Sequence, residues 1–246
     1  MKNKTFNFQV IISIASLFFY INYFGVLKGI SIALIILTHE LGHLLAAKRL
    51  KIKTNGLFLF PFGGIAVMEE PLYKKDSITV LLSGSLLGSV IILPFLLIFF
   101  FTKNTLFLEV TSWTLLLNGF NLLPIVSLDG GKVFRHAIKS FGRLPSLLFI
   151  LFSSIFTAFF AFSVSPIISG GYSVILFILV GISFYWFSKE AINYYEYKVN
   201  KNDFYDYSYS SDLLSKSRSF LTMLTCITAS AFMIISGIYL LKGLNG

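Results

Sequence analysis

The chain has 246 residues, of which 56% are hydrophobic and only 13% are charged, and its formal net charge is +9. Soluble globular proteins are about 25% charged, so this composition excludes a soluble fold and predicts a single integral-membrane domain over 1–246. A lone cysteine, Cys226, excludes a disulfide framework.

The positive charge follows a membrane topology and does not indicate a nucleic-acid partner. Seven apolar stretches alternate with basic segments; they cover about 8–27, 30–47, 78–101, 105–125, 144–165, 172–188 and 221–241. If the N-terminus is cytoplasmic, all of the 20 Lys and Arg residues except Lys28, Lys103 and Lys242 lie on the cytoplasmic side. We therefore predict an all-α, multi-pass protein of the cell membrane, with about six or seven spans in the lipid bilayer.

The first stretch begins with basic residues, as a signal peptide does. Its exit, residues 22–27, has no small-x-small cleavage site. We expect a retained first helix, and a cleaved signal peptide is the alternative.

The second stretch contains the pentad His39-Glu40-Leu41-Gly42-His43. Histidines four residues apart share one face of a helix, so both imidazoles can reach one zinc ion at about 2.0–2.1 Å. Glu40 lies about 100° round the helix, where it can hold a metal-bound water as the general base. Packing inside the membrane is the alternative, but three ionisable groups at that depth need a common partner, which a divalent metal supplies.

The segment 57–68 is too short to span a membrane and too apolar for an ordinary loop. Pro61 and Gly63-Gly64 exclude a continuous helix, and the phenylalanines before them alternate as in a strand. We predict a hairpin that dips into the membrane from the cytoplasmic side, with a flat interfacial loop as the alternative. By hypothesis, its edge binds an unwound substrate as an added strand.

Two other segments are expected to have structural roles. Small residues at Ser83-Gly84-Ser85 and Gly88 permit close contact between helices, so we predict a packing role for them. The segment 189–220 combines tyrosines with charges of both signs, which predicts a cytoplasmic loop.

The fourth stretch is predicted to be a broken helix. Pro124 interrupts it, and Asp129-Gly130-Gly131 follows at the cytoplasmic end, at the depth expected for the histidines. A catalytic zinc needs three protein ligands and an open position, and Asp129 is the best-placed third ligand. Asn121 shares a face with Asn118, and its amide is a candidate donor to the tetrahedral intermediate. Asn118 is the weaker candidate, and helix packing is the alternative for both.

These residues resemble the site-2 protease family of intramembrane zinc metalloproteases, peptidase family M50. The pentad looks like the family's zinc motif. The segment 121–130 is similar to its Asn-x-x-Pro-x-x-x-x-Asp-Gly motif, whose Asp is the third zinc ligand, and 62–66 looks like its Gly-Gly hairpin. The resemblance implies a catalytic core over 30–131 that holds one zinc per chain through His39, His43 and Asp129.

The chain has no room for a PDZ domain between its spans, so the resemblance is to the compact bacterial members of that family. They act on membrane-tethered regulators, pro-proteins or short exported peptides. We therefore predict a zinc metalloendopeptidase that hydrolyses a peptide bond in or beside a membrane segment of a membrane-bound precursor or small exported peptide. Glu40 would activate the zinc-bound water. The alternatives are a catalytically silent binder of membrane segments and a metal transporter, and the oligomeric state is left open.

Overall fold

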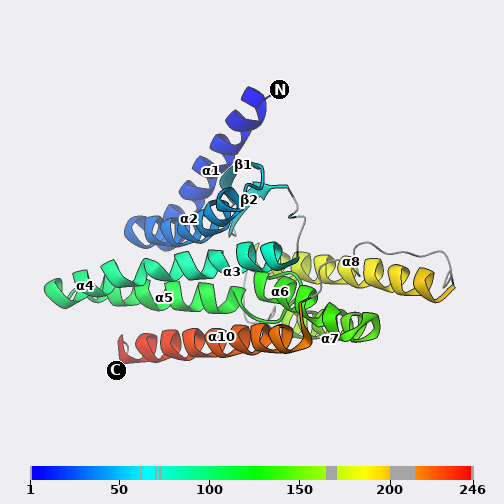
Figure 1. Ribbon diagram of the computed structural model, residues 1–246. Helices are drawn as coiled ribbons and strands as arrows, with labels where there is room; N and C mark the ends of the chain where they lie inside the picture. Colours follow the sequence, from blue (N-terminus) through cyan, green and yellow to red (C-terminus); the bar gives the residue numbers. More distant parts are fainter. Residues whose placement is uncertain are drawn as a thin grey trace. The chain divides into compact units, whose positions relative to one another are not determined.

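A computed structural model describes residues 2–60, 63–69, 71, 74–164, 171–199 and 214–244. Helices account for most of this part of the chain, together with one small two-stranded sheet (Figure 1). The chain divides into two units. The first consists of Met1–Leu72, Thr79–Asn121 and Thr228–Gly246, and the second of Tyr73–Ile78 and Leu122–Ile227. The predicted all-α architecture is confirmed, and the sheet is the predicted hairpin.

Five segments are helical, long enough and apolar enough to cross a membrane: Asn7–Phe24, Val26–Arg49, Lys75–Thr102, Arg143–Ser163 and Lys216–Leu244. They belong to α1 (Lys2–Phe24), α2 (Val26–Arg49), α3 and α4 (Lys74–Val90 and Ile92–Thr102), α7 (Arg143–Val164) and α10 (Lys216–Leu244). The predicted spans 105–125 and 172–188 correspond to α5 (Thr105–Asn121) and α8 (Gly171–Val199), which are helical but are not among these five.

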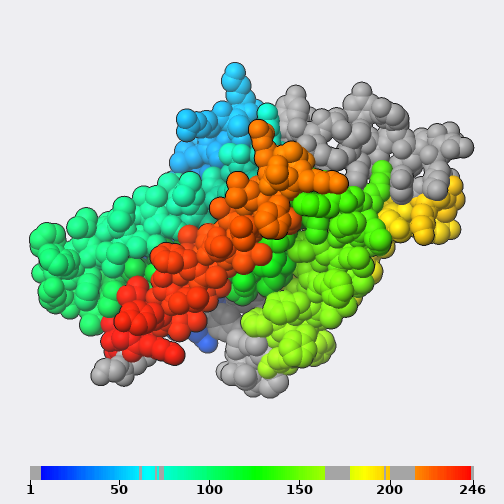
Figure 2. Space-filling view, turned by 60° about the horizontal axis from the view of Figure 1, so that its bottom comes forward, coloured from blue at the N-terminus to red at the C-terminus, as the bar shows by residue number. Residues whose placement is uncertain are grey.

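The five segments leave most of their surface uncovered, since only 11–39% of each is buried. Figure 2 shows one uncovered side of α10, and its exposed residues Phe232, Ile235 and Tyr239 are large and apolar or aromatic. Large exposed apolar faces suit contact with lipid rather than water. The chain is therefore a multi-pass membrane protein.

The turn between the first two helices lies earlier than the sequence suggested. The predicted spans ended at 27 and resumed at 30, but α1 ends at Phe24 and α2 starts at Val26. Gly25 makes this turn with φ of +84°, a conformation that glycine adopts at no steric cost. Gly29 lies inside α2, where an added Cβ would be 2.6 Å from the backbone of Tyr20, so it permits close contact with α1.

The third predicted span is one apolar segment made of two helices. Helix α3 ends at Val90 and α4 begins at Ile92. Pro94 explains the break, because a proline ring clashes with the carbonyl four residues earlier, which here belongs to Val90.

The predicted hairpin is confirmed as β1 (Thr54–Phe60) and β2 (Gly63–Met68), which pair antiparallel. Leu57 faces Ala66 and Leu59 faces Gly64 in the register. Pro61 and Phe62 lie outside the described residues. The hairpin packs against α1 and α2 within the first unit (Figure 1). Its depth in the membrane stays a prediction.

Helix α1 covers the outer edge of β1 with three hydroxyl groups. Ser13 Oγ accepts a hydrogen bond from Leu59 N–H at 3.0 Å, and Ser16 Oγ donates to Leu59 O at 3.1 Å. The Tyr20 hydroxyl donates to the Phe60 carbonyl and accepts from Gly63 N–H. Unpaired backbone groups are costly in an apolar environment, so these side chains do for β1 what a third strand would do.

The second unit begins where the fourth predicted span breaks. Helix α5 ends at Asn121 and α6 (Asp129–Ile138) starts eight residues later, which confirms the broken helix. Val126 N–H in the intervening turn donates to Ser153 Oγ of α7 at 2.8 Å. The 3₁₀-helix η1 (Lys139–Phe141), α7, α8 and the part of α10 up to Ile227 also belong to this unit.

The segment 189–220, predicted as a cytoplasmic loop, is helical over part of its described residues. Helix α8 continues to Val199, so the first part of that segment is helical. Residues 200–213 lie outside the described part of the chain, and α10 starts at Lys216.

The hydroxyl of Tyr20 gives a test of the α1 contact. Replacing Tyr20 by Phe removes both hydrogen bonds that join α1 to the hairpin turn. A typical net contribution of about 1 kcal/mol per bond predicts at least a roughly fivefold faster exchange of the Gly63 amide. Hydrogen–deuterium exchange of the segment 57–68 in detergent measures this. Tyr239→Phe, on an exposed position of α10, is the matched control. Unchanged exchange in Tyr20→Phe would contradict the assigned role.

Candidate metal centre

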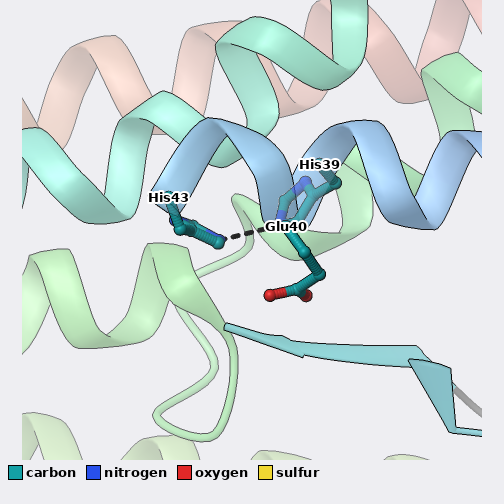
Figure 3. Close-up of side chains that lie close together, drawn as sticks. All are labelled: His39, Glu40 and His43. Atoms are coloured by element: carbon teal, nitrogen blue, oxygen red, sulfur yellow. Dashed lines mark hydrogen bonds between the residues drawn. The ribbon is translucent and has the colours of Figure 1, made fainter. Parts of the chain in front are cut away.

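His39, Glu40 and His43 form a group on α2 in the first unit (Figure 3). One potential ligand atom from each residue lies within 4.8 Å of the other two. Both histidines are buried, with exposed fractions of 5% and 6%. The predicted clustering of the pentad on one helix is therefore confirmed.

The two imidazoles point their Nε2 atoms at one another. The distance between His39 Nε2 and His43 Nε2 is 3.1 Å. Two nitrogen ligands at about 2.0–2.1 Å from one tetrahedral ion would be roughly 3.3 Å apart. The observed pair is thus close to the spacing that zinc requires.

The hydrogen-bond partner of Nδ1 determines which nitrogen of each ring carries the proton. His43 Nδ1 is 2.7 Å from Val80 O, and His39 Nδ1 is 2.9 Å from Asn118 Oδ1. Both partners are carbonyl oxygens, which only accept, so we assign the proton of each neutral ring to Nδ1. Each Nε2 then presents a lone pair to the other ring at 3.1 Å, an arrangement that a cation bound by both atoms would stabilise. The donor set therefore fits a bound metal ion.

Gly84 of α3 leaves the space that the two imidazole rings need. A Cβ added at Gly84 would overlap Cε1 and Nε2 of His43 and would lie 2.9 Å from His39 Nε2. The packing role predicted for this small-residue segment is also present, since Ser83 Oγ donates to Gly42 O at 3.0 Å where α2 and α3 meet. The sequence analysis predicted only helix packing here and missed the contact between Gly84 and the two histidines.

The Glu40 carboxylate points toward the hairpin (Figure 3). Its Oε2 accepts a hydrogen bond from Ala66 N–H of β2 at 2.9 Å. Gly64 lies under the same side chain, because an added Cβ there would overlap Glu40 Cγ and lie 3.1 Å from Cδ. The strand edge thus holds the carboxylate beside the histidines.

The two asparagines of α5 have different positions. Asn121 Nδ2 is 3.3 Å from His39 Nε2, so an amide donor reaches the metal-binding nitrogens. Its role as a donor to substrate stays a prediction. Both polar atoms of the Asn118 side chain have protein partners: Oδ1 accepts from His39, and Nδ2 donates to Thr114 O at 2.9 Å. The structure does not support the weaker prediction that Asn118 stabilises the tetrahedral intermediate.

Asp129, the predicted third ligand, belongs to the second unit, where it is the first residue of α6. It is buried, and its Oδ1 accepts a hydrogen bond from Lys132 Nζ at 3.1 Å. Its role as a metal ligand stays a prediction.

Comparisons with known proteins found matches to part of this chain. Residues 29–114 match the model of Peptidase family M50, and this range contains the pentad and Gly84. A zinc metalloprotease from Methanocaldococcus jannaschii is 32% identical over 117 residues, which cover 45% of this chain and 34% of the relative. The chain thus spans about a third of the length of this curated relative. The family match ends before Asn121 and Asp129.

Gly84→Ala tests the space over the histidines. The added methyl group would overlap the His43 ring, so we expect zinc affinity to fall by at least about tenfold, as metal sites respond to changes in the groups that orient their ligands. Competition with a chromophoric chelator on the purified protein measures the affinity.

Gly243→Ala, in the same unit, is the matched control because nothing lies within 4 Å of its added Cβ. Native zinc affinity in Gly84→Ala would show that the ion does not lie beneath this glycine.

Proposed function

We propose that this chain is a member of peptidase family M50 and, within it, an intramembrane zinc metalloprotease of the site-2 protease type. The observation that carries the proposal is the pair of imidazole lone pairs under Gly84, with a carboxylate one residue away on the same membrane helix. This combination is a metal-dependent hydrolase site placed where a substrate would be a membrane segment.

His39 and His43 would hold one zinc ion per chain, with Asp129 as the proposed third ligand on sequence grounds. When bound, zinc supplies a Lewis acid that polarises the scissile carbonyl and lowers the pKa of water toward about 7. The buried histidines keep their lone pairs available because Val80 and Asn118 hold the ring protons on the opposite side.

Glu40 is the proposed general base. Its carboxylate takes a proton from the attacking water and passes it to the leaving amine. The hydrogen bond from Ala66 N–H fixes the carboxylate in position before the reaction. The Asn121 amide is the proposed donor to the substrate oxygen as negative charge develops on it.

The proposed substrate is a membrane-embedded protein or a small exported peptide, cut in or beside its apolar segment. Its recognition follows from the two edges of the hairpin. Hydroxyl groups of α1 close the β1 edge at Leu59, whereas the β2 edge presents Ala66 N–H to Glu40. An extended peptide added along β2 would place its backbone beside the base. The Lys and Arg distribution supports a cytoplasmic N-terminus, and we propose no nucleic-acid partner.

Glu40→Gln tests the proposed activity. Gln removes the base and keeps the shape and the zinc ligands, so we expect zinc content to be retained and cleavage to fall by about a hundredfold or more. Mass spectrometry of membrane-associated and secreted peptides, from cells with the native chain or the variant, detects new termini in or beside apolar segments.

Glu69→Gln is the matched control because Glu69 is exposed and pairs with Lys53 at the base of the hairpin. Termini that appear with the native chain and the control, but not with Glu40→Gln, would identify the substrate. Identical termini in all three, with zinc bound, would favour a silent binder or a metal transporter.

A further inference from the structure

We infer that Asn118 is a positioning residue of the metal centre, which fixes the orientation and the ring proton of His39. The inference rests on the proposed zinc site and adds a residue that lies outside both recognised motifs. Asn118 is 1% exposed, so its polar atoms depend on protein partners.

The amide of Asn118 can adopt only one orientation. In the observed orientation Oδ1 accepts from His39 Nδ1–H, and Nδ2 donates to Thr114 O at 2.9 Å. Exchanging the two ends would bring Oδ1 against the Thr114 carbonyl and leave two acceptors in contact. The fixed amide therefore keeps the proton on His39 Nδ1 and the lone pair on Nε2, where it faces His43.

Helix α3 shapes the site in which Asn118 lies. A Cβ added at Gly88 would overlap Asn118 Oδ1 and lie 3.0 Å from its Cγ. Ser85 Oγ donates to the backbone carbonyl of Asn118 at 3.3 Å. Gly84 and Gly88 are one turn apart on α3, so one glycine accommodates the metal-binding rings and the next accommodates the group that orients one of them.

The two histidines differ in how they are held. The acceptor for His43 is the backbone carbonyl of Val80, whereas the acceptor for His39 is the side-chain carbonyl of Asn118. A substitution can therefore remove the support of His39 and leave that of His43 in place. Loss of such an outer partner typically weakens metal binding by about 10–100-fold.

The test uses the full-length chain, purified in detergent, with Asn118→Leu as the main variant. Leu has a similar volume and no acceptor. We expect zinc affinity, from competition with a chromophoric chelator, to fall by about 10–100-fold. The d–d absorption of the cobalt-loaded protein should also change, because His39 no longer has a fixed orientation. Thr111→Val is the matched control, since Thr111 is a fully buried α5 residue whose hydroxyl contacts only its own helix among the hydrogen bonds described.

A second variant, Gly88→Ala, displaces the amide without deleting it, and we expect it to shift affinity and cobalt absorption in the same direction. Gly88→Ala replaces Asn118→Leu as the test if Asn118→Leu does not fold, as judged by thermal melting of the metal-free protein. Native zinc affinity and native cobalt absorption in a folded variant would overturn the inference. His39→Ala tests the proposed zinc site separately from the role of Asn118. If this variant binds zinc as tightly as the native chain, the zinc site itself is wrong.

Discussion

Two imidazole lone pairs that face each other at 3.1 Å impose the main constraint on the first unit. To hold one cation together, each ring must keep its proton on the far side, and the space around the two Nε2 atoms must admit the ion. Val80 of α3 and Asn118 of α5 meet the first condition, and Gly84 meets the second. The close contact of α2, α3 and α5 thus serves the chemistry of one pair of atoms.

The hairpin meets a second constraint, which is the hydrogen bonding of strand edges in apolar surroundings. On the β1 side, Ser13, Ser16 and Tyr20 occupy the backbone groups that a neighbouring strand would otherwise bind. On the β2 side, Glu40 accepts from Ala66. The same residue that serves as the proposed base therefore also satisfies one backbone N–H of β2. Structure and proposed catalysis thus share this contact.

The sequence predicted those features that depend on local spacing or on rare residue types. Histidines four residues apart must share a helix face, and a short apolar segment with a Gly-Gly pair cannot be a spanning helix. The roles of Gly84, Asn118 and Ser16 depend instead on contacts between segments far apart in the chain, and glycine, asparagine and serine are common in helix packing. The turn at Gly25 was misplaced because its neighbours are apolar and give no sign of the positive φ there.

The hydrogen bond between Glu40 and Ala66 comes from the main chain of β2 and not from a side chain. The contact at residue 66 therefore needs only the N–H, and proline is the one natural substitution that removes this donor. Gly64 has no such freedom, because Glu40 fills the place of its Cβ. The strand beside the base thus combines a position that requires glycine with one that contributes only its main chain. Related chains could differ in the peptides they accept without any change in how the carboxylate is held.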